Sequence, residues 1–295
     1  MRILLFIFCI GLHPMIHAMD TVRVQTVIQF FDSLQSDRLI LLEPGIYDFT
    51  KHLQLETLDQ SRVHKDLVLG PNIRYSSEDG VTLYMAKNIR IVGMGSNPSS
   101  TIFTSSFLGD EVLTLLGCQH IRIENIQLTH SADASGTIKG GLLKVSQSTD
   151  VNVKNCELLG RASVGLTSWR SKDLHIHSTL ISACSYGIVD LKDSWTLRFE
   201  ACIFKENKAC QYFWLMSGCT DVQIQTCEFN DNIKRGNRNC EDSRLFSFAR
   251  CEMVLFENNS IKGNECDYMG DREVMRIANS TNELKRNKFV NISSN

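Results

Sequence analysis

The chain has 295 residues, of which 43% are hydrophobic and 22% are charged, and its formal net charge is −2. A charge this close to zero argues against a nucleic-acid partner, because such a partner normally requires a basic stripe. With 18 glycines and 4 prolines the sequence has no linker-like run, so we predict a single folded domain from residue 19 to residue 295.

Residues 1–18 have the layout of a secretory signal peptide. Met1 and Arg2 precede an apolar run that extends from Ile3 to Leu12. This run is too short to span a bilayer, and no later segment is long and apolar enough to do so. We predict cleavage after residue 18 and a secreted or periplasmic protein. The alternative is a short buried helix in a cytosolic protein.

The next segment predicts an N-terminal cap at residues 20–36. Apolar residues between positions 22 and 34 follow a helical spacing, which indicates a helix with one buried face. Residues 38–49 then read as a strand, a turn at Pro44-Gly45 and a second strand. We expect the leucine pairs at 53/55 and 67/69 to form incomplete first coils.

From Val81 to Phe289 one short pattern recurs about eight times. Its reference positions are Met94, Ile126, Cys156, Thr179, Cys202, Cys227, Asn259 and Asn287. The residue three positions before each reference is always apolar, and so, with one exception, is the residue five before; this two-residue spacing is the period of a strand. Units this short bury a core only by stacking. The interval of 23 to 32 residues suits a coil of three short strands, whereas the leucine spacing of leucine-rich repeats is missing.

The pattern therefore predicts an all-β fold, a single-stranded parallel β-helix of about eight to ten coils, with regular coils at about 81–290. Blocks such as 148–158 and 219–229 resemble the right-handed repeats of the pectin-lyase-like superfamily. Asn259 and Asn287 stand where that superfamily stacks an internal asparagine ladder. The resemblance implies the fold, which hosts lyases, hydrolases, binding proteins and scaffolds.

The repeat register divides the eleven cysteines into two groups. We expect six of them to lie at interior turns and to act as small apolar residues: Cys118, Cys156, Cys202, Cys219, Cys227 and Cys251. Four others fall in the variable loops, where we predict the disulfides Cys184–Cys210 and Cys240–Cys266. Zinc is the alternative, but no cysteine or histidine pair has the close ligand spacing that zinc sites favour, so we expect no metal and no other cofactor.

The position of the insertions predicts a groove. All the long loops fall in the same gap of the repeat, and the short connections 159–165 and 182–188 leave a notch between them. In polysaccharide lyases of the superfamily, a groove beside the neighbouring sheet holds the sugar chain. The residues expected to face outward from that sheet are Thr82, Thr114, Lys144, Thr167, Asp190, Leu215 and Ser247.

Within this groove we predict Lys144, Asp190 and Lys192 as catalytic candidates. A basic residue could remove the proton next to a uronate carboxyl group, and cations could stabilise the enolate-like charge that develops. The substrate-binding candidates are Trp169, Arg170, Tyr84 and Asp193, since a tryptophan face suits stacking on a sugar ring. The alternative interpretation is that these charged residues only pair across coils.

A second outward row alternates in charge and favours ion pairs between coils. His175 and His177 in this row could hold a metal, but a third ligand is not evident in the sequence. The catalytic motifs of pectate lyases and polygalacturonases are missing. Two functions stay open: a non-catalytic exported β-helix that binds a polysaccharide or surface glycan, and a polysaccharide lyase or glycoside hydrolase acting in the same groove. We expect a monomer.

Overall fold

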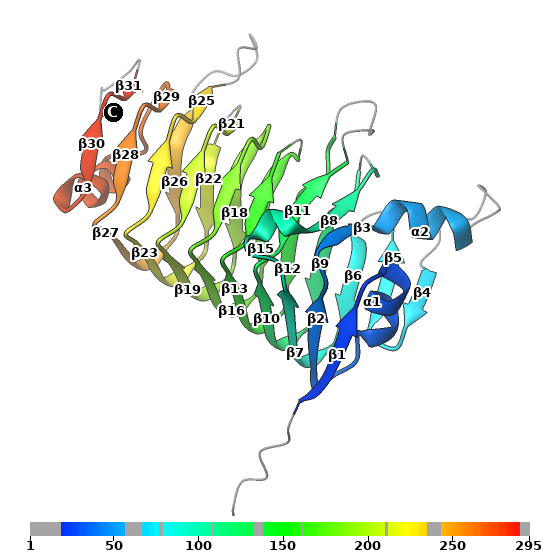
Figure 1. Ribbon diagram of the computed structural model, residues 1–295. Helices are drawn as coiled ribbons and strands as arrows, with labels where there is room; N and C mark the ends of the chain where they lie inside the picture. The colour runs from blue at the N-terminus through cyan, green and yellow to red at the C-terminus, as the bar shows by residue number, and fades with distance from the viewer. Residues whose placement is uncertain are drawn as a thin grey trace, which may run out of the picture.

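The structure, a computed structural model, describes residues 19–56, 67–76, 79–107, 109–131, 138–160, 162–209, 212–234 and 243–289. Its strands form three nine-stranded sheets and one four-stranded sheet, which we name A to D. In Figure 1 the coils follow one another from the blue N-terminal strands to the red C-terminal ones, with α1 (Val27–Ser33) and α2 (Phe49–Glu56) at one end and α3 (Arg272–Ser280) at the other.

Every pairing in sheets A, B and D is parallel, and sheet C is parallel from β6 onward. Sheet A contains β1 (Asp20–Val24), β2 (Arg38–Leu42), β7 (Lys87–Gly93), β10 (Gln119–Glu124), β13 (Thr149–Lys154), β16 (Lys172–His177), β19 (Trp195–Glu200), β23 (Thr220–Gln225) and β27 (Glu252–Glu257). Sheet B contains β3 (Gly45–Asp48), β8 (Thr101–Ser105), β11 (Gln127–His130), β14 (Glu157–Leu159), β17 (Leu180–Ser182), β20 (Ile203–Lys205), β24 (Glu228–Asn230), β28 (Ser260–Lys262) and β30 (Glu283–Lys285).

Sheets C and D complete the coils. Sheet C contains β4 (Leu67–Gly70), β5 (Ile73–Ser76), β6 (Gly80–Tyr84), β9 (Leu113–Leu116), β12 (Leu143–Ser146), β15 (Val164–Trp169), β18 (Gly187–Lys192), β22 (Tyr212–Ser217) and β26 (Arg244–Ala249). Sheet D contains β21 (Lys208–Ala209), β25 (Ile233–Lys234), β29 (Glu265–Cys266) and β31 (Lys288–Phe289). A short 3-10 helix, η2 (Pro98–Ser100), precedes β8. The structure therefore confirms the predicted parallel β-helix.

Alternation along each strand explains how the coils share one core. In β13, Val151 and Val153 are buried while Asn152 between them faces outward. Val151 lies beside Ile121 on one neighbouring strand and beside Leu174 on the other, so apolar side chains stack in continuous columns. Apolar burial stabilises the fold by about 25 cal/mol per Å² removed from water.

Polar and thiol side chains form ladders at the interior turns. The backbone N–H of Cys118 donates to the Ser148 hydroxyl at 3.0 Å, and that of Ser171 donates to the Ser194 hydroxyl at 3.1 Å. These contacts satisfy backbone groups that the sharp turns leave unpaired inside the core. The predicted interior column of serines and cysteines is thus confirmed.

A second ladder occupies the turn between sheets B and D. Asn207 and Asn264 flank Asn232: the Asn207 side chain donates to Asn232 Oδ1 at 2.9 Å, and Asn232 donates to Asn264 Oδ1 at 2.8 Å. Cys184 begins this column, since its N–H donates to Asn207 Oδ1 at 3.0 Å. The segments predicted to be loops after β20, β24 and β28 therefore begin with the strands of sheet D.

The cysteines of the predicted disulfides do not occupy loops where the structure describes them. Cys184 and Cys266 are free thiols with exposed fractions of 1% and 0%. Both side chains point into the core, so the prediction that they join surface loops is wrong. Cys210 and Cys240 lie outside the described residues.

The N-terminal cap differs from the prediction in its first half. Residues 20–24 form β1, which pairs in parallel with β2, because Val22 and Val24 alternate with polar residues as in a strand. The helix begins only after Thr26, whose hydroxyl accepts the N–H of Gln29. Leu53 lies on α2 and not on a coil strand, and residues 67–70 pair antiparallel with β5.

The last coil was assigned the wrong register. Asn287 stacks on Asn264 and not on Asn259, because Asn282 occupies the rung next to Asn259 and accepts its N–H at 2.8 Å. Val274, predicted on a strand, lies on α3. The helix replaces two strands of the final coil, so the usual spacing fails there. Among the described residues, no helix is long and apolar enough to cross a membrane, and residues 1–18 lie outside them.

Replacing Asn232 with alanine tests the asparagine ladder. The change removes Asn232 Oδ1, which accepts hydrogen bonds from the backbone N–H and the side-chain amide of Asn207. Alanine provides no other acceptor for these buried donors. We expect a loss of about 2–4 kcal/mol in the free energy of unfolding, measured by chemical denaturation. Asn230→Ala is the control: that side chain donates to Glu228 at 2.8 Å, and its Oδ1 accepts no hydrogen bond from the described residues, so no buried donor loses its acceptor. Equal effects of the two changes would contradict a stabilising role for the ladder.

Candidate functional site

The predicted outward row on sheet C has the register that the repeat indicated. Lys144, Thr167 and Asp190 lie on successive strands and are direct neighbours across β12, β15 and β18. The N-terminal end of this row is covered: Thr82 and Thr114 are buried, and the Thr114 hydroxyl donates to the Asp79 carbonyl at 2.6 Å. The open part of the row therefore begins at Lys144.

The three catalytic candidates do not converge on one point. Lys144 donates to Asp79 Oδ1 at 2.7 Å, and Lys192 donates to Asp190 Oδ2 at 2.9 Å. Lys144 and Asp190 are separated by the Thr167 strand, which corresponds to roughly 10 Å between backbones. Both lysines thus have carboxylate partners, but not the predicted ones: Lys192 and Asp190 pair within β18 and not across coils, and Lys144 pairs with Asp79.

A pocket of 340 Å³ opens over Asp190. Tyr186 and Tyr212 line it with Asp190, and the remaining lining residues are Val164, Gly187, Val189 and Leu215. Val164, Gly187 and Tyr212 come from consecutive coils. A Cβ atom at Gly187 would lie 3.2 Å from the Tyr212 carbonyl oxygen and 3.9 Å from Val164 Cγ2, so the glycine leaves room between these two neighbours.

One carboxylate oxygen of Asp190 lacks a partner beside this pocket. Oδ2 is held by Lys192, whereas Oδ1 is buried and has no hydrogen-bond partner in the described part of the chain. A buried acceptor without a donor is unfavourable, so a ligand hydroxyl or N–H group gains a hydrogen bond here when the Asp190 side chain turns Oδ1 toward the pocket. The sequence analysis found Asp190 but missed both tyrosines, which lie outside the repeated block.

Three of the four predicted sugar-binding residues lie near the pocket, and the fourth, Tyr84, does not. Trp169 lies beside Lys192 in the strand register, and the Arg170 guanidinium stacks on its ring at 4.5 Å. Trp169 is 36% exposed and extends the surface next to Asp190. Asp193 lies in the following turn with a φ of 49°. Tyr84 is three strands away, beneath Arg74, and does not belong to this surface.

A carboxylate cluster near Lys144 was not found from the sequence. The Tyr75 hydroxyl donates to Asp110 Oδ2 at 2.7 Å, and Glu111 accepts the N–H of Gly141. Burial raises the pKa of Asp110 to about 6, although the Tyr75 hydrogen bond lowers it, and the charge of Asp79 adds to the rise. Burial likewise raises the pKa of Glu111. Asp110 is only 5% exposed, so the cluster joins β5 to the loop before β9 instead of facing a ligand.

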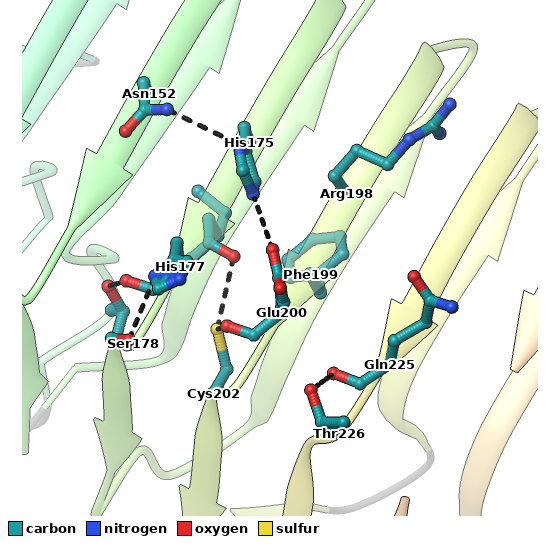
Figure 2. A network of polar contacts seen from close by, with 12 residues as sticks. Asn152, His175, His177, Ser178, Arg198, Phe199, Glu200, Cys202, Gln225 and Thr226 are labelled. Carbon is teal, nitrogen blue, oxygen red and sulfur yellow. Dashed lines mark hydrogen bonds and ion pairs between the residues drawn. The ribbon is translucent and has the colours of Figure 1, made fainter. Parts of the chain in front are cut away.

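The outer face of sheet A carries a polar network around two histidines (Figure 2). His175 Nε2 lies 3.6 Å from Glu200 Oε2, and the rings of His175 and His177 are 5.9 Å apart. His177 instead contacts the Ser178 hydroxyl at 2.9 Å. Burial lowers the pKa of His175, and the charge of His177 acts in the same direction. In the described ranges, no group of three or more side chains is placed to hold a metal ion.

Arginines of that row form inter-coil ion pairs of the kind that the charge alternation predicted. Arg90 binds both oxygens of Glu124 at 2.9 Å, and Arg198 binds both oxygens of Asp221 at 2.9 and 3.0 Å. Exposed pairs of this kind contribute little stability each, on the order of 0–1 kcal/mol. We therefore locate the candidate ligand site on sheet C and not on sheet A.

Comparison with known proteins agrees with this architecture. The family model described as the right handed beta helix region matches residues 68–229, which is more than half of the chain. The chain belongs to the right-handed β-helix family. A comparison with curated proteins finds no match.

Solved structures resemble the chain only at the level of the fold. ORF18 of Geobacillus virus E2 is 11% identical with a TM-score of 0.43, and the match covers 82% of this chain and 52% of that protein, so this chain spans about half its length. Rice weevil pectin methyl esterase is 12% identical with a TM-score of 0.42, over 77% and 70% of the two chains. Alginate lyase from a Paenibacillus species is 11% identical with a TM-score of 0.37, over 93% and 96%.

Changing Asp110 to asparagine tests the carboxylate cluster. Because the folded-state pKa of Asp110 is about 6, above the unfolded value of roughly 4, the folded protein binds this proton more tightly. The contribution of Asp110 to stability is therefore complete below about pH 4 and is lost as the pH rises through about 6. We expect D110N to remove a fall of about 2 kcal/mol in the free energy of unfolding across this range.

Asp150→Asn is the matched control with the opposite sign. Burial acts to raise the pKa of Asp150, but hydrogen bonds and charge from Arg122 and His120 lower it overall. Its contribution to stability is present above the unfolded pKa and is lost as the pH falls. Denaturation curves measured across the pH range distinguish the two variants, and a D110N curve parallel to that of the unaltered protein would contradict the assignment.

Proposed function

We propose that this β-helix protein is exported and binds a polysaccharide along the outer face of sheet C, with the pocket at Asp190 as one sugar subsite. The observation that carries this proposal is the unpartnered Oδ1 of Asp190 at a pocket that Tyr186 and Tyr212 also line. Concave pockets with aromatic walls and a few placed polar groups are typical ligand sites, and 340 Å³ lies within their usual range.

The chemistry of the pocket suits a sugar ring. Tyr186 and Tyr212 supply flat apolar surface, and Asp190 Oδ1 supplies an acceptor for a hydroxyl group. A hydroxyl group of the sugar would give Asp190 Oδ1 the hydrogen bond that it lacks in the free protein. Hydrogen bonds to charged groups such as this carboxylate are stronger than those between neutral groups. The exposed face of Trp169 next to this row offers a second surface for the chain beyond the pocket.

The local charges favour a neutral or amino sugar over a uronate in this subsite. The carboxylate of Asp190 already has its cation, Lys192, and a second carboxylate brought to Oδ1 would be repelled. Lys144 is likewise held by Asp79 at 2.7 Å. Neither lysine is placed to accept a proton from a bound uronate at Oδ1.

The pocket lining also favours binding without cleavage, because it contains a single carboxylate among the described residues. A glycoside hydrolase usually acts with two carboxylates on either side of the scissile bond. Of the described residues that line the pocket, only Asp190 carries a carboxylate. We therefore propose a binding protein, and retain the lyase or hydrolase as the alternative outcome of the experiment below.

Export follows from the predicted signal peptide at residues 1–18, which would bring the mature chain to extracellular or periplasmic glycans. With that location, a polysaccharide or surface glycan is the partner that we propose, for a monomeric protein. The candidate residues within reach of one chain on this face are Asp190, Lys192, Trp169 and Arg170.

Titration calorimetry of residues 19–295 with a panel of neutral, amino-sugar and uronate polysaccharides tests the proposal. We expect D190A and Y212A to weaken binding of the best ligand at least about tenfold, equivalent to about 1.4 kcal/mol, because each removes one wall or anchor of the pocket. Thr167→Ala is the matched control: it alters the neighbouring rung of the same row without lining the pocket.

Three results would contradict the proposal. The folded protein could fail to bind every member of the panel, or D190A could bind as tightly as the unaltered protein. Ultraviolet-absorbing unsaturated product, or new reducing ends, that disappear in D190A or K144A would establish the lyase or hydrolase instead.

A further inference from the structure

The C-terminal end of the solenoid contains a second pocket, of 570 Å³. It lies between α3 and the ends of β26 and β27, which are the last strands of sheets C and A. Phe248, Met253 and Val254 give it an apolar wall, Arg272 and other charged side chains of α3 form the opposite one, and Cys251 is also exposed to it. No role in glycan binding was assigned to this end of the molecule.

Cys251 is the last thiol of the interior column that begins at Cys118. Its neighbour in the column is Cys219, because the pairs on both sides, Ser217 with Ala249 and Thr220 with Glu252, are in register. Neighbouring parallel strands lie about 4.8 Å apart, which falls within the range of Cα separations found in disulfides. The next coil provides no rung beyond Cys251, since α3 replaces those strands.

The two thiols differ in environment. Cys219 is fully buried and directs its thiol toward the Leu191 carbonyl at 3.6 Å, whereas Cys251 is partly exposed. The hydrogen bond from Cys219 lowers the pKa of Cys251 to about 7, and the charge of Arg250 adds to this, although partial burial opposes it. The same contact raises the pKa of Cys219. A low pKa together with access is the combination that makes a thiol reactive.

We propose that Cys251 and Cys219 form a thiol–disulfide exchange site that accepts a low-molecular-weight disulfide with an apolar substituent in the C-terminal pocket. The Cys251 thiolate attacks one sulfur of the disulfide RSSR, so a bond between Cys251 and SR forms, the S–S bond breaks and RS⁻ leaves. Cys219 then attacks the Cys251 sulfur as its thiolate, the bond between Cys251 and SR breaks, and the leaving RS⁻ takes up the proton that Cys219 has lost, as RSH. Two protein thiols are oxidised to one disulfide, and RSSR is reduced to two thiols.

The same fold supplies an internal comparison. Cys202 and Cys227 are also consecutive rungs of an interior column, and each also shifts the pKa of the other. Both are 0% exposed, and neither lines the C-terminal pocket. Both pairs are therefore stacked on consecutive coils, but of the four thiols only Cys251 lines the pocket. If only Cys251 reacts, the cause is its contact with the pocket at the open end of the column, and not stacking on another thiol.

The experiment uses the full mature chain and dithiobis-nitrobenzoate, an aromatic disulfide whose released thiolate is followed by absorbance. We expect a fast phase at pH 7, at least roughly tenfold faster than an ordinary thiol, because Cys251 combines a lowered pKa with access to the pocket. The fast phase releases two thiolates per chain in the unaltered protein. Peptide mapping then finds a bond between Cys219 and Cys251.

Two substitutions separate the roles of the thiols. Cys251→Ser removes the fast phase. Cys219→Ser leaves one released thiolate and a stable mixed disulfide, and it preserves the fold because serine occupies the same column at Ser148, Ser171 and Ser194. Cys202→Ser, the control, leaves the fast phase unchanged. A fast phase that survives in C251S, or equal labelling of Cys227 in the folded protein, would overturn the proposal.

Discussion

Parallel stacking of the coils is the constraint on which the whole structure depends. Successive strands lie about 4.8 Å apart, so every interior position becomes a column of similar side chains, and every sharp turn leaves backbone N–H groups inside the core. The Ser148 hydroxyl accepts such an N–H group, that of Cys118. The Asn232 amide and the Cys227 thiol instead donate to backbone carbonyls of the preceding coil, those of Phe204 and Phe199. Large apolar side chains then fill the space between these ladders.

The columns explain how much of the fold could be predicted from the sequence. Burial of Val151 and its neighbours recurs at a fixed distance from each turn, so a simple alignment of the chain on itself recovers the strands of sheets A and C. A second asparagine column was equally visible: Asn207, Asn232 and Asn264 each follow a reference position by five residues. Because that segment was treated as variable loop, sheet D and the interior position of Cys184 were missed.

Prediction failed where the chain departs from the column rule. α3 shortens the last coil, so Asn282 and Asn287 both fit an asparagine column and spacing alone chose the wrong one. The contact between Tyr75 and Asp110 joins a hairpin to a loop 35 residues later, and no repeat relates the two. Tyr186 and Tyr212 stand just outside the repeated block, so their approach to Asp190 depends on how the connections fold.

Both proposed sites occur where a ladder is incomplete. Within a continuous column, a polar side chain can be paired with the next coil, as Arg198 is with Asp221, and it then offers little to a ligand. At Asp190 the neighbours on the adjacent coils are Thr167 and Leu215; Lys192 of the same strand holds one carboxylate oxygen, and the other has no partner in the described part of the chain. At Cys251 the inner column ends, so a thiol that would be sealed by the next rung is open to a pocket. In a fold built by repetition, recognition and reactivity are therefore expected at the positions where the repetition stops.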